Sequence, residues 1–326
     1  MPTDWDFSTK LRAEPPKPIV TYGLCVLCAF LTFAYHSPGL SPVLARLGMI
    51  AAPGAAQIWD GAYWALLTTF FVHGDIMHIL FNMMIFIQLG RAMEAVLAPW
   101  AFILFLAAAA AVSCGCELAV TGIQGVGASG AVYAMFGLMW MGRDRYREWR
   151  GLATERNMQM FLVWGVICIV GTLAGFMHIA NVAHFSGLLF GFAVGALFLA
   201  PTRKLIWAAP LALTIALAAL SLFWLPWNAE WTYHRGSKAF AAKDFHAAVS
   251  WYHRSLKLGG SRYYNWENIK RAWVNIEDDA IRRHDYKAAE EAQRQQESAG
   301  SLEGPDPSTQ REQPAGPTFH MPGEKK

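Results

Sequence analysis

The chain has 326 residues, of which 54% are hydrophobic and only 16% are charged. This composition is too apolar for a soluble globular protein of this size. The net charge of +3 is small and both signs are mixed along the chain, so nucleic acid is not among the partners that we expect.

Charged residues are unevenly divided along the chain. Residues 1–227 hold 12 of the 27 Lys and Arg residues and 10 of the 24 Asp and Glu residues, although they make up more than two thirds of the sequence. Residues 228–326 hold the others and have an ordinary soluble composition. The sequence therefore predicts a membrane domain followed by a soluble domain. All five cysteines precede residue 228, which excludes a disulfide framework or a zinc module in the soluble part.

Seven apolar segments in the first part predict transmembrane helices. A hydrocarbon core about 30 Å thick is crossed by about 20 apolar residues of helix. The fourth segment is shorter than this, which places its first residue, Ser129, below the outer surface and indicates a cavity there. Residues 36–77 are semi-apolar, and we expect them to lie in the headgroup region. The seven segments are 19–35, 78–97, 100–120, 129–141, 158–179, 184–200 and 205–227.

Basic residues define the expected orientation. If residues 1–18 form a cytoplasmic segment, the inner side holds eleven Lys and Arg residues, Arg91 near the inner end of the second span included, and the outer loops hold only Arg46. The positive-inside rule favours this arrangement, and an odd number of spans then places the C-terminal region outside the cytoplasm. No cleavable signal peptide or transit peptide is expected, so the first span is interpreted as a signal anchor in a bacterial cytoplasmic (inner) membrane.

Few titratable or nucleophilic side chains lie in or beside these segments, and each is a candidate functional group because polar groups are costly inside a membrane. The metalloprotease pattern His-Glu-x-x-His is absent, and no predicted span contains Asp. We therefore expect neither a metal site nor a cofactor, nor a pair of catalytic aspartates. The candidates are His73, Asp75, His78, Glu94, Glu117, Ser129, Tyr133, His178 and His184.

Ser129 and His184 form the most informative pair. Ser129 follows a glycine-rich stretch at the start of a predicted helix, where free backbone N–H groups suit an oxyanion, although an isolated Gly-x-Ser-Gly more often only packs helices. His184 shares a helix face with Gly187 and two further glycines, and helix 129–141 has a matching face of small residues. Both helices run from outside to inside. Packing of the two faces would therefore place Ser129 and His184 at the same depth.

His78 and Asn82 stand four residues apart on one face of the second predicted span. An imidazole and an amide in this position can donate hydrogen bonds to a developing oxyanion. Taken alone, the pair is more simply a hydrogen-bonded contact between helices.

Four motifs occur in a fixed order and together resemble the rhomboid family of intramembrane serine proteases, over about residues 19–200. One departure is that Trp64 is followed by Ala65, where the family commonly has Trp-Arg. The motifs are His78-x-x-x-Asn82, Gly90-x-x-x-Glu94, Gly127-x-Ser129-Gly130 with Tyr133, and Ala183-His184-x-x-Gly187-x-x-x-Gly191.

The resemblance implies the fold and the roles of individual residues. It implies a protease core of six helices over 19–200, with residues 201–227 as an additional seventh helix. Ser129 would be the nucleophile and His184 its general base, in a dyad without an acid. His78, Asn82 and the Ser129 N–H would form the oxyanion hole, and the substrates would be transmembrane proteins in the lipid bilayer. The supporting residues would be Tyr133, which positions His184, and Gly127, Gly130, Gly187 and Glu94.

The soluble region resembles a tetratricopeptide repeat, a pair of antiparallel helices with small residues at the crossing. A weaker copy follows, in which Ala289 corresponds to Ala248. The offset between the two copies is 41 residues, whereas such repeats are about 34 residues long. We expect a helical-repeat region over 228–297 that binds a protein partner, and a disordered tail over 298–326. The residues that carry the first repeat are Trp231, Gly236, Ala239, Phe240, Phe245, Ala248 and Tyr252.

The predicted fold class is thus all-α, a polytopic membrane helix bundle with a small soluble helical-repeat tail. The predicted function is intramembrane serine proteolysis. The alternative is a non-proteolytic membrane scaffold that presents the repeat region, and the complete set of catalytic residues favours the enzyme.

Overall fold

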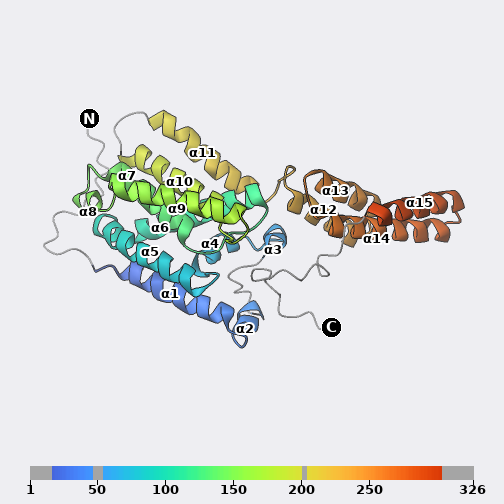
Figure 1. Cartoon of the computed structure of the whole chain (residues 1–326), viewed down its shortest axis with the longest axis horizontal. Helices are drawn as coiled ribbons and strands as arrows, with labels where there is room; N and C mark the ends of the chain where they lie inside the picture. The colour runs from blue at the N-terminus through green and yellow to red at the C-terminus, as the bar shows by residue number, and fades with distance from the viewer. Residues whose placement is uncertain (1–16, 47–53, 200–203, 303–326) are drawn as a thin grey trace. The chain divides into compact units, whose positions relative to one another are not determined.

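The computed structural model describes residues 17–46, 54–199 and 204–302, and the regular secondary structure of these residues is helical (Figure 1). The chain divides into two compact units, Met1–Phe223 and Trp224–Lys326. Each unit has its own buried core. The prediction of an all-helical chain with an apolar first part and a polar second part is therefore confirmed.

In the described part of the first unit, seven helices coincide in order with the seven predicted segments. Five of them are long and apolar enough to cross a membrane, namely α1, α5, α6, α9 and α10, so the chain is a multi-pass membrane protein. Helices α7 and α11 are shorter, with 14 and 17 residues. The bounds are α1 (Ile19–His36), α5 (Ile76–Val96), α6 (Pro99–Thr121), α7 (Ser129–Gly142), α9 (Glu155–Leu173), α10 (Asn181–Leu199) and α11 (Lys204–Leu220).

Two predicted helix ends were wrong. The segment predicted to reach residue 179 ends at Leu173, because Gly175 takes a left-handed conformation with φ +78° that stops the helix. The segment predicted to reach residue 227 ends at Leu220. There the chain turns, and the Asn228 side chain accepts a hydrogen bond from the Trp231 N–H to cap the next helix.

Between α1 and α5, the described residues include four short helices. They are α2 (Ser41–Arg46), α3 (Ala55–Trp59), α4 (Ala65–Thr68) and the 3₁₀ helix η1 (Thr69–Phe71). Ile58, Ala65 and Leu66 are buried against Cys114 and Leu118 of α6. The complete burial of Ala65 explains why a small residue follows Trp64 here.

Helix α7 lies at the centre of the bundle, with contacts to α5, α6 and α10, and nearly all of its side chains are buried. Glycines of α10 face backbone carbonyls of α7 directly. A Cβ atom at Gly187 would collide with the Gly130 carbonyl, and one at Gly191 would collide with the Ala134 carbonyl. The predicted packing of the two small-residue faces is confirmed, because only glycine permits so close an approach of two backbones. A short helix, α8 (Arg147–Arg150), lies between α7 and α9 in the chain.

The second unit consists of two helical pairs, α12 (Ala229–Ala241) with α13 (Phe245–Lys257) and α14 (Arg262–Arg282) with α15 (Tyr286–Leu302). Both pairs turn in the same way. Lys243 and His284 have positive φ angles of 62° and 59°, and each is followed by an aspartate that caps the next helix, Asp244 or Asp285. The 41-residue offset of the sequence pattern is therefore the offset between two equivalent turns.

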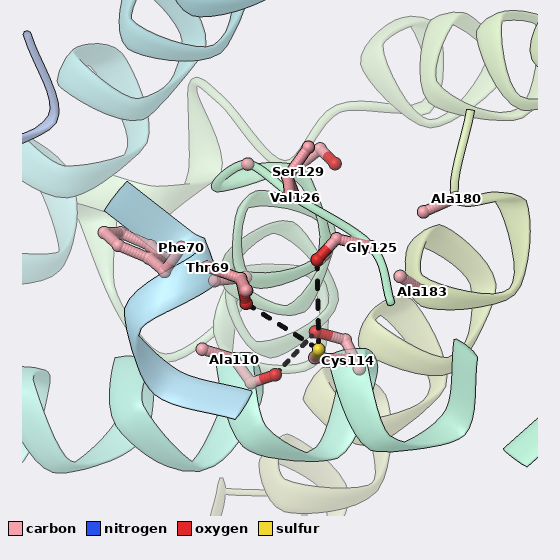
Figure 2. A pocket seen from close by; sticks show the side chains of 13 residues that line it. Thr69, Phe70, Ala110, Cys114, Gly125, Val126, Ser129, Ala180 and Ala183 are labelled. Carbon is pink, nitrogen blue, oxygen red and sulfur yellow. Dashed lines mark hydrogen bonds between the residues drawn. The ribbon is translucent and has the colours of Figure 1, made fainter. Parts of the chain in front are cut away.

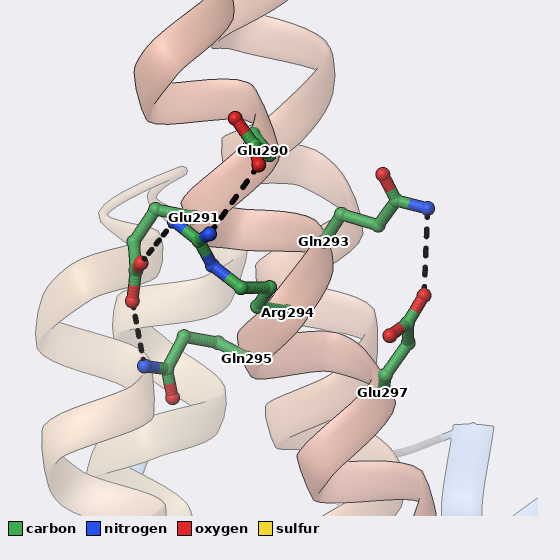
Figure 3. Close-up of polar contacts among 6 residues, drawn as sticks. All are labelled: Glu290, Glu291, Gln293, Arg294, Gln295 and Glu297. Atoms are coloured by element: carbon green, nitrogen blue, oxygen red, sulfur yellow. Dashed lines mark hydrogen bonds and ion pairs between the residues drawn. The ribbon is translucent and has the colours of Figure 1, made fainter.

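Helix α15 continues to Leu302, past the expected boundary at residue 297, because Ala299 is buried in the core of this unit. Its exposed face is lined by side-chain pairs three and four residues apart (Figure 3). Such pairs support an exposed helix only weakly, because solvent screens them. The expected tail from residue 303 onward lies outside the described residues. The residues drawn are Glu290, Glu291, Gln293, Arg294, Gln295 and Glu297.

Candidate active site

Ser129 and His184 meet at the N-terminal ends of α7 and α10. Ser129 is the first residue of α7, and His184 lies in the first turn of α10. The distance between Ser129 Oγ and His184 Nε2 is 2.8 Å, a hydrogen bond. With Nε2 as the acceptor, the hydroxyl donates and the imidazole carries its hydrogen on Nδ1. This is the arrangement in which a serine hydroxyl passes its proton to a neighbouring base.

The backbone contact between α7 and α10 produces this distance. Gly130 follows Ser129, and its carbonyl oxygen lies against Gly187 of α10. Both helices start at this end of the bundle. The two side chains therefore project from adjacent first turns.

The ring of Tyr133 holds the plane of the imidazole. The Tyr133 and His184 rings are stacked, with centroids 4.6 Å apart and planes inclined by 6°. The Tyr133 hydroxyl donates a hydrogen bond to the Phe161 carbonyl oxygen of α9, at 3.0 Å. His184 Nδ1 is buried and has no hydrogen-bond partner among the residues that the structure describes. Ring stacking and the position of α10 therefore orient the imidazole.

His78 lies beside the glycine-rich segment that leads to Ser129. Gly127 has φ +102°, and a Cβ atom there would lie 2.8 Å from Nε2 of His78. The Gly74 N–H donates to His78 Nδ1 at 3.3 Å. Because Nδ1 accepts, the hydrogen of the neutral ring is on Nε2, the nitrogen next to Gly127. His78 thus presents a donor on the side of the ring that faces this segment.

Asn82 follows one turn later on α5 and is buried. Its Nδ2 donates to the His78 carbonyl oxygen at 2.9 Å. An amide nitrogen has two hydrogens, so one remains after this bond. His78 thus lies beside the segment that precedes Ser129. The Asn82 amide, in contrast, is hydrogen-bonded to the backbone of its own helix, α5.

His73 has a structural role that the sequence did not indicate. Its Nε2 accepts a hydrogen bond from the Ala128 N–H at 3.3 Å, and its Nδ1 lies 3.4 Å from the Thr32 hydroxyl. The side chain is completely buried. His73 therefore fixes the residue before Ser129 to α1. These partners are 41 and 55 positions away in the chain, so no local pattern could have predicted the contacts.

Glu94 supports a different part of the bundle. Its carboxylate accepts from the Thr21 N–H at 2.7 Å, from the Val20 N–H at 3.1 Å and from the Thr21 hydroxyl at 2.6 Å. Gly90, one turn earlier, gives Thr21 the space that it needs. Glu94 of α5 is therefore hydrogen-bonded to the first turn of α1. These hydrogen bonds do not involve the Ser129–His184 pair.

A pocket lies beside Ser129, as the short fourth helix predicted (Figure 2). Its walls are mostly small side chains and backbone, including Ala110, Gly125 and Ala183. The Cys114 thiol donates to the Gly125 carbonyl oxygen at 3.9 Å and accepts from the Thr69 hydroxyl at 3.7 Å (Figure 2). The pocket therefore suits a small side chain next to the serine hydroxyl.

Known proteins match the part of the chain that holds this site. Residues 60–201 match the family model described as a rhomboid domain. Proteins named "Rhomboid protease GlpG" are similar. That of Yersinia pestis (strain Pestoides F) is 34% identical over 128 residues, which is 39% of this chain and 45% of the relative. That of Photorhabdus laumondii subsp. laumondii is 35% identical over 147 residues, 44% of this chain and 50% of the relative.

The protein of the same name from Yersinia enterocolitica serotype O:8 is 32% identical over 154 residues, 44% of this chain and 55% of the relative. The chain thus spans about half the length of the curated relatives that it matches. The matched range contains the Ser129–His184 pair, Tyr133, His78, Asn82 and the pocket. Residues 60–201 of this chain are therefore similar to a rhomboid domain.

Proposed function

We propose that this chain is an intramembrane serine protease that hydrolyses peptide bonds in or near the transmembrane segments of membrane proteins. The observation that carries the proposal is the 2.8 Å hydrogen bond between Ser129 Oγ and His184 Nε2, inside a rhomboid domain. The similar proteins named as rhomboid proteases support it.

In the proposed reaction, Ser129 Oγ attacks the carbonyl carbon of the scissile peptide bond while its proton moves to His184 Nε2. The tetrahedral intermediate then collapses, the C–N bond breaks, and His184 returns the proton to the leaving amine. A water molecule then attacks the acyl-enzyme ester and gives its proton to His184 Nε2. When this second intermediate collapses, the bond to Ser129 Oγ breaks and His184 returns the proton to Oγ, which releases the carboxylic acid and restores the serine hydroxyl.

The negative oxygen of each intermediate needs donors next to Ser129. The start of α7 leaves the Ser129 N–H without an intrahelical acceptor. His78 Nε2–H, beside Gly127, and the second amide hydrogen of Asn82 are the side-chain donors that we propose. The pocket beside Ser129 would take a small side chain of the substrate.

We further propose that six spans form the protease core and that α11 is an additional, seventh span. The N-terminus would lie in the cytoplasm of a bacterium. The second unit would then lie on the outer side of the cytoplasmic membrane, where its tetratricopeptide-like helical pairs would bind a protein partner. Eleven inner basic residues against Arg46 outside support this orientation. External protease added to spheroplasts should digest the second unit, and a protected unit would contradict the orientation.

Labelling with a serine-directed fluorophosphonate tests the proposed activity. The detergent-solubilised protein should be labelled at Ser129, and a reconstituted single-span substrate should be cleaved. Folded Ser129→Ala should show neither reaction. A wild-type protein that is neither labelled nor active on any single-span substrate would contradict the proposal and favour the scaffold.

A further inference from the structure

Glu117 is a buried carboxylate that the proposed mechanism does not use. It lies near the end of α6 and is 5% exposed. Its Oε2 accepts a hydrogen bond from the Ala183 N–H at 2.9 Å. Ala183 directly precedes His184. The carboxylate of α6 is therefore attached to the backbone turn that carries the proposed general base.

This hydrogen bond satisfies a group that α10 leaves unpaired. The first N–H groups of a helix have no intrahelical acceptor, and the start of a helix attracts negative charge. Ala183 is the third residue of α10. A carboxylate that accepts from its N–H forms a charge-assisted hydrogen bond, which is stronger than a neutral one. Loss of the carboxylate would leave this backbone donor unpaired and free the first turn of α10.

The same face of α6 also supports the segment that carries Ser129. A Cβ atom at Gly125 would lie 3.7 Å from Cγ of Glu117, so the stem of Glu117 packs beneath Gly125. One turn earlier on α6, Ser113 fills the space beside Gly130; a Cβ atom there would lie 2.7 Å from Cβ of Ser113. Glu117 and Ser113 thus contact both chain segments whose side chains form the pair.

We infer that Glu117 is a positioning residue, whose carboxylate holds the first turn of α10 so that His184 Nε2 stays within hydrogen-bond distance of Ser129 Oγ. In a triad, a carboxylate orients the base by accepting from its Nδ1–H. Here His184 Nδ1 has no such partner among the described residues. The carboxylate acts instead on the backbone N–H of Ala183, the residue directly before His184. This inference rests on the proposed protease function.

The test compares Glu117→Gln and Glu117→Ala with Glu94→Gln. Glu94 is a matched control because its carboxylate is also 5% exposed and also accepts backbone N–H groups at a helix start, that of α1. Three quantities are measured for each full-length variant: the melting temperature, the rate of Ser129 labelling by a fluorophosphonate, and kcat and KM on a reconstituted single-span substrate.

Glu117→Ala should lower kcat about 100-fold with KM within about twofold, because a base displaced by about 1 Å loses its alignment with the nucleophile. Glu117→Gln keeps one acceptor oxygen, so its kcat should be only about tenfold below that of wild type. Labelling rates should follow kcat. Glu94→Gln should lower the melting temperature and leave the labelling rate of the folded protein within about twofold of wild type.

The results separate the inference from the proposed function. If wild type is labelled and Glu117→Ala is folded and labelled equally fast, the inference is overturned and the protease function stands. If Glu117→Ala does not fold, Glu117→Gln decides, and a kcat equal to that of wild type overturns the inference. Equal kcat losses in Glu94→Gln and Glu117→Gln would show a general effect of stability and overturn it too. A wild-type protein that is neither labelled nor active overturns both.

Discussion

The imidazole of His184 lies parallel to the ring of Tyr133, with ring centroids 4.6 Å apart and an interplanar angle of 6°. Tyr133 is itself fixed by its hydroxyl, which donates to the Phe161 carbonyl oxygen. One face of the imidazole is therefore covered by a rigid aromatic surface. Rotation of the ring away from Ser129 would break this stack.

Substitution of Tyr133 should separate the effect of the stack from that of the hydroxyl. Tyr133→Phe keeps the ring and should lower kcat by no more than about threefold, since the lost hydrogen bond contributes about 1 kcal/mol or less. Tyr133→Ala removes the stack and should lower kcat about 10- to 100-fold. It should also lower stability by about 3–5 kcal/mol, because a large buried side chain is lost. Cleavage kinetics and thermal melts measure both effects, and equal kcat values for the two variants would exclude orientation by stacking.

Ser129 and His184 should behave as one unit. Ser129→Ala and His184→Ala should each abolish cleavage nearly as completely as the double substitution, because neither group acts without the other. The measurement is single-turnover cleavage of a reconstituted substrate by folded variants. Additive losses in the double variant would indicate that the two residues act independently.

Asn82→Ala should leave slow residual activity. Loss of one oxyanion donor costs about 2.7–4 kcal/mol, on the order of a hundred- to thousandfold in kcat. KM should change little, since the donor acts on the charge that develops in the transition state. Normal kcat in this variant would limit Asn82 to its hydrogen bond with the His78 carbonyl oxygen.

Gly187→Ala should destabilise the first unit, because the added methyl group meets the Gly130 carbonyl of α7. Overpacking of this kind costs about 1–3 kcal/mol or more. Gly23→Ala is the control, since nothing lies within 4 Å of a Cβ atom at Gly23. Thermal melts in detergent should show a lower midpoint only for Gly187→Ala, and equal midpoints would contradict the close packing of α7 and α10.

A chain that ends at Phe223 should keep Ser129 labelling, because the pair, the pocket and the matched rhomboid domain all precede this residue. A chain that ends at residue 199 also lacks α11 and should melt at a lower temperature. Ala218 of α11 packs directly against Gly115 of α6, and Thr214 accepts from the Cys116 thiol through its carbonyl oxygen at 3.4 Å. Loss of labelling in the chain that ends at Phe223 would show that the second unit is needed for activity.

The sequence predicted the helices of the first unit because their apolar runs are long and bounded by charged residues. It also predicted that Ser129 and His184 lie close together, because Gly130, Gly187 and Gly191 form matching faces. The predicted ends near residues 179 and 227 were wrong, since the apolar composition continues past the turns that stop α9 and α11. Composition indicates where a helix is favourable, and the left-handed Gly175 decides where it stops.

The sequence alone assigned no structural contacts to His73 and Glu117. Both accept hydrogen bonds from backbone N–H groups, of Ala128 and Ala183 respectively. A backbone donor has the same chemistry at every residue other than proline, so such a contact leaves no pattern of side chains. Both are polar side chains in or beside the predicted spans, and their backbone partners are defined only by the fold.

The backbone contact of Gly187 with Gly130 has a consequence for the energetics of the proposed reaction. Two main chains, and not two flexible side chains, set the spacing between nucleophile and base. The loss of entropy that accompanies their alignment therefore occurs when the bundle folds, before any substrate arrives. In the proposed reaction, substrate binding energy would then be left for bringing the scissile carbonyl to Ser129.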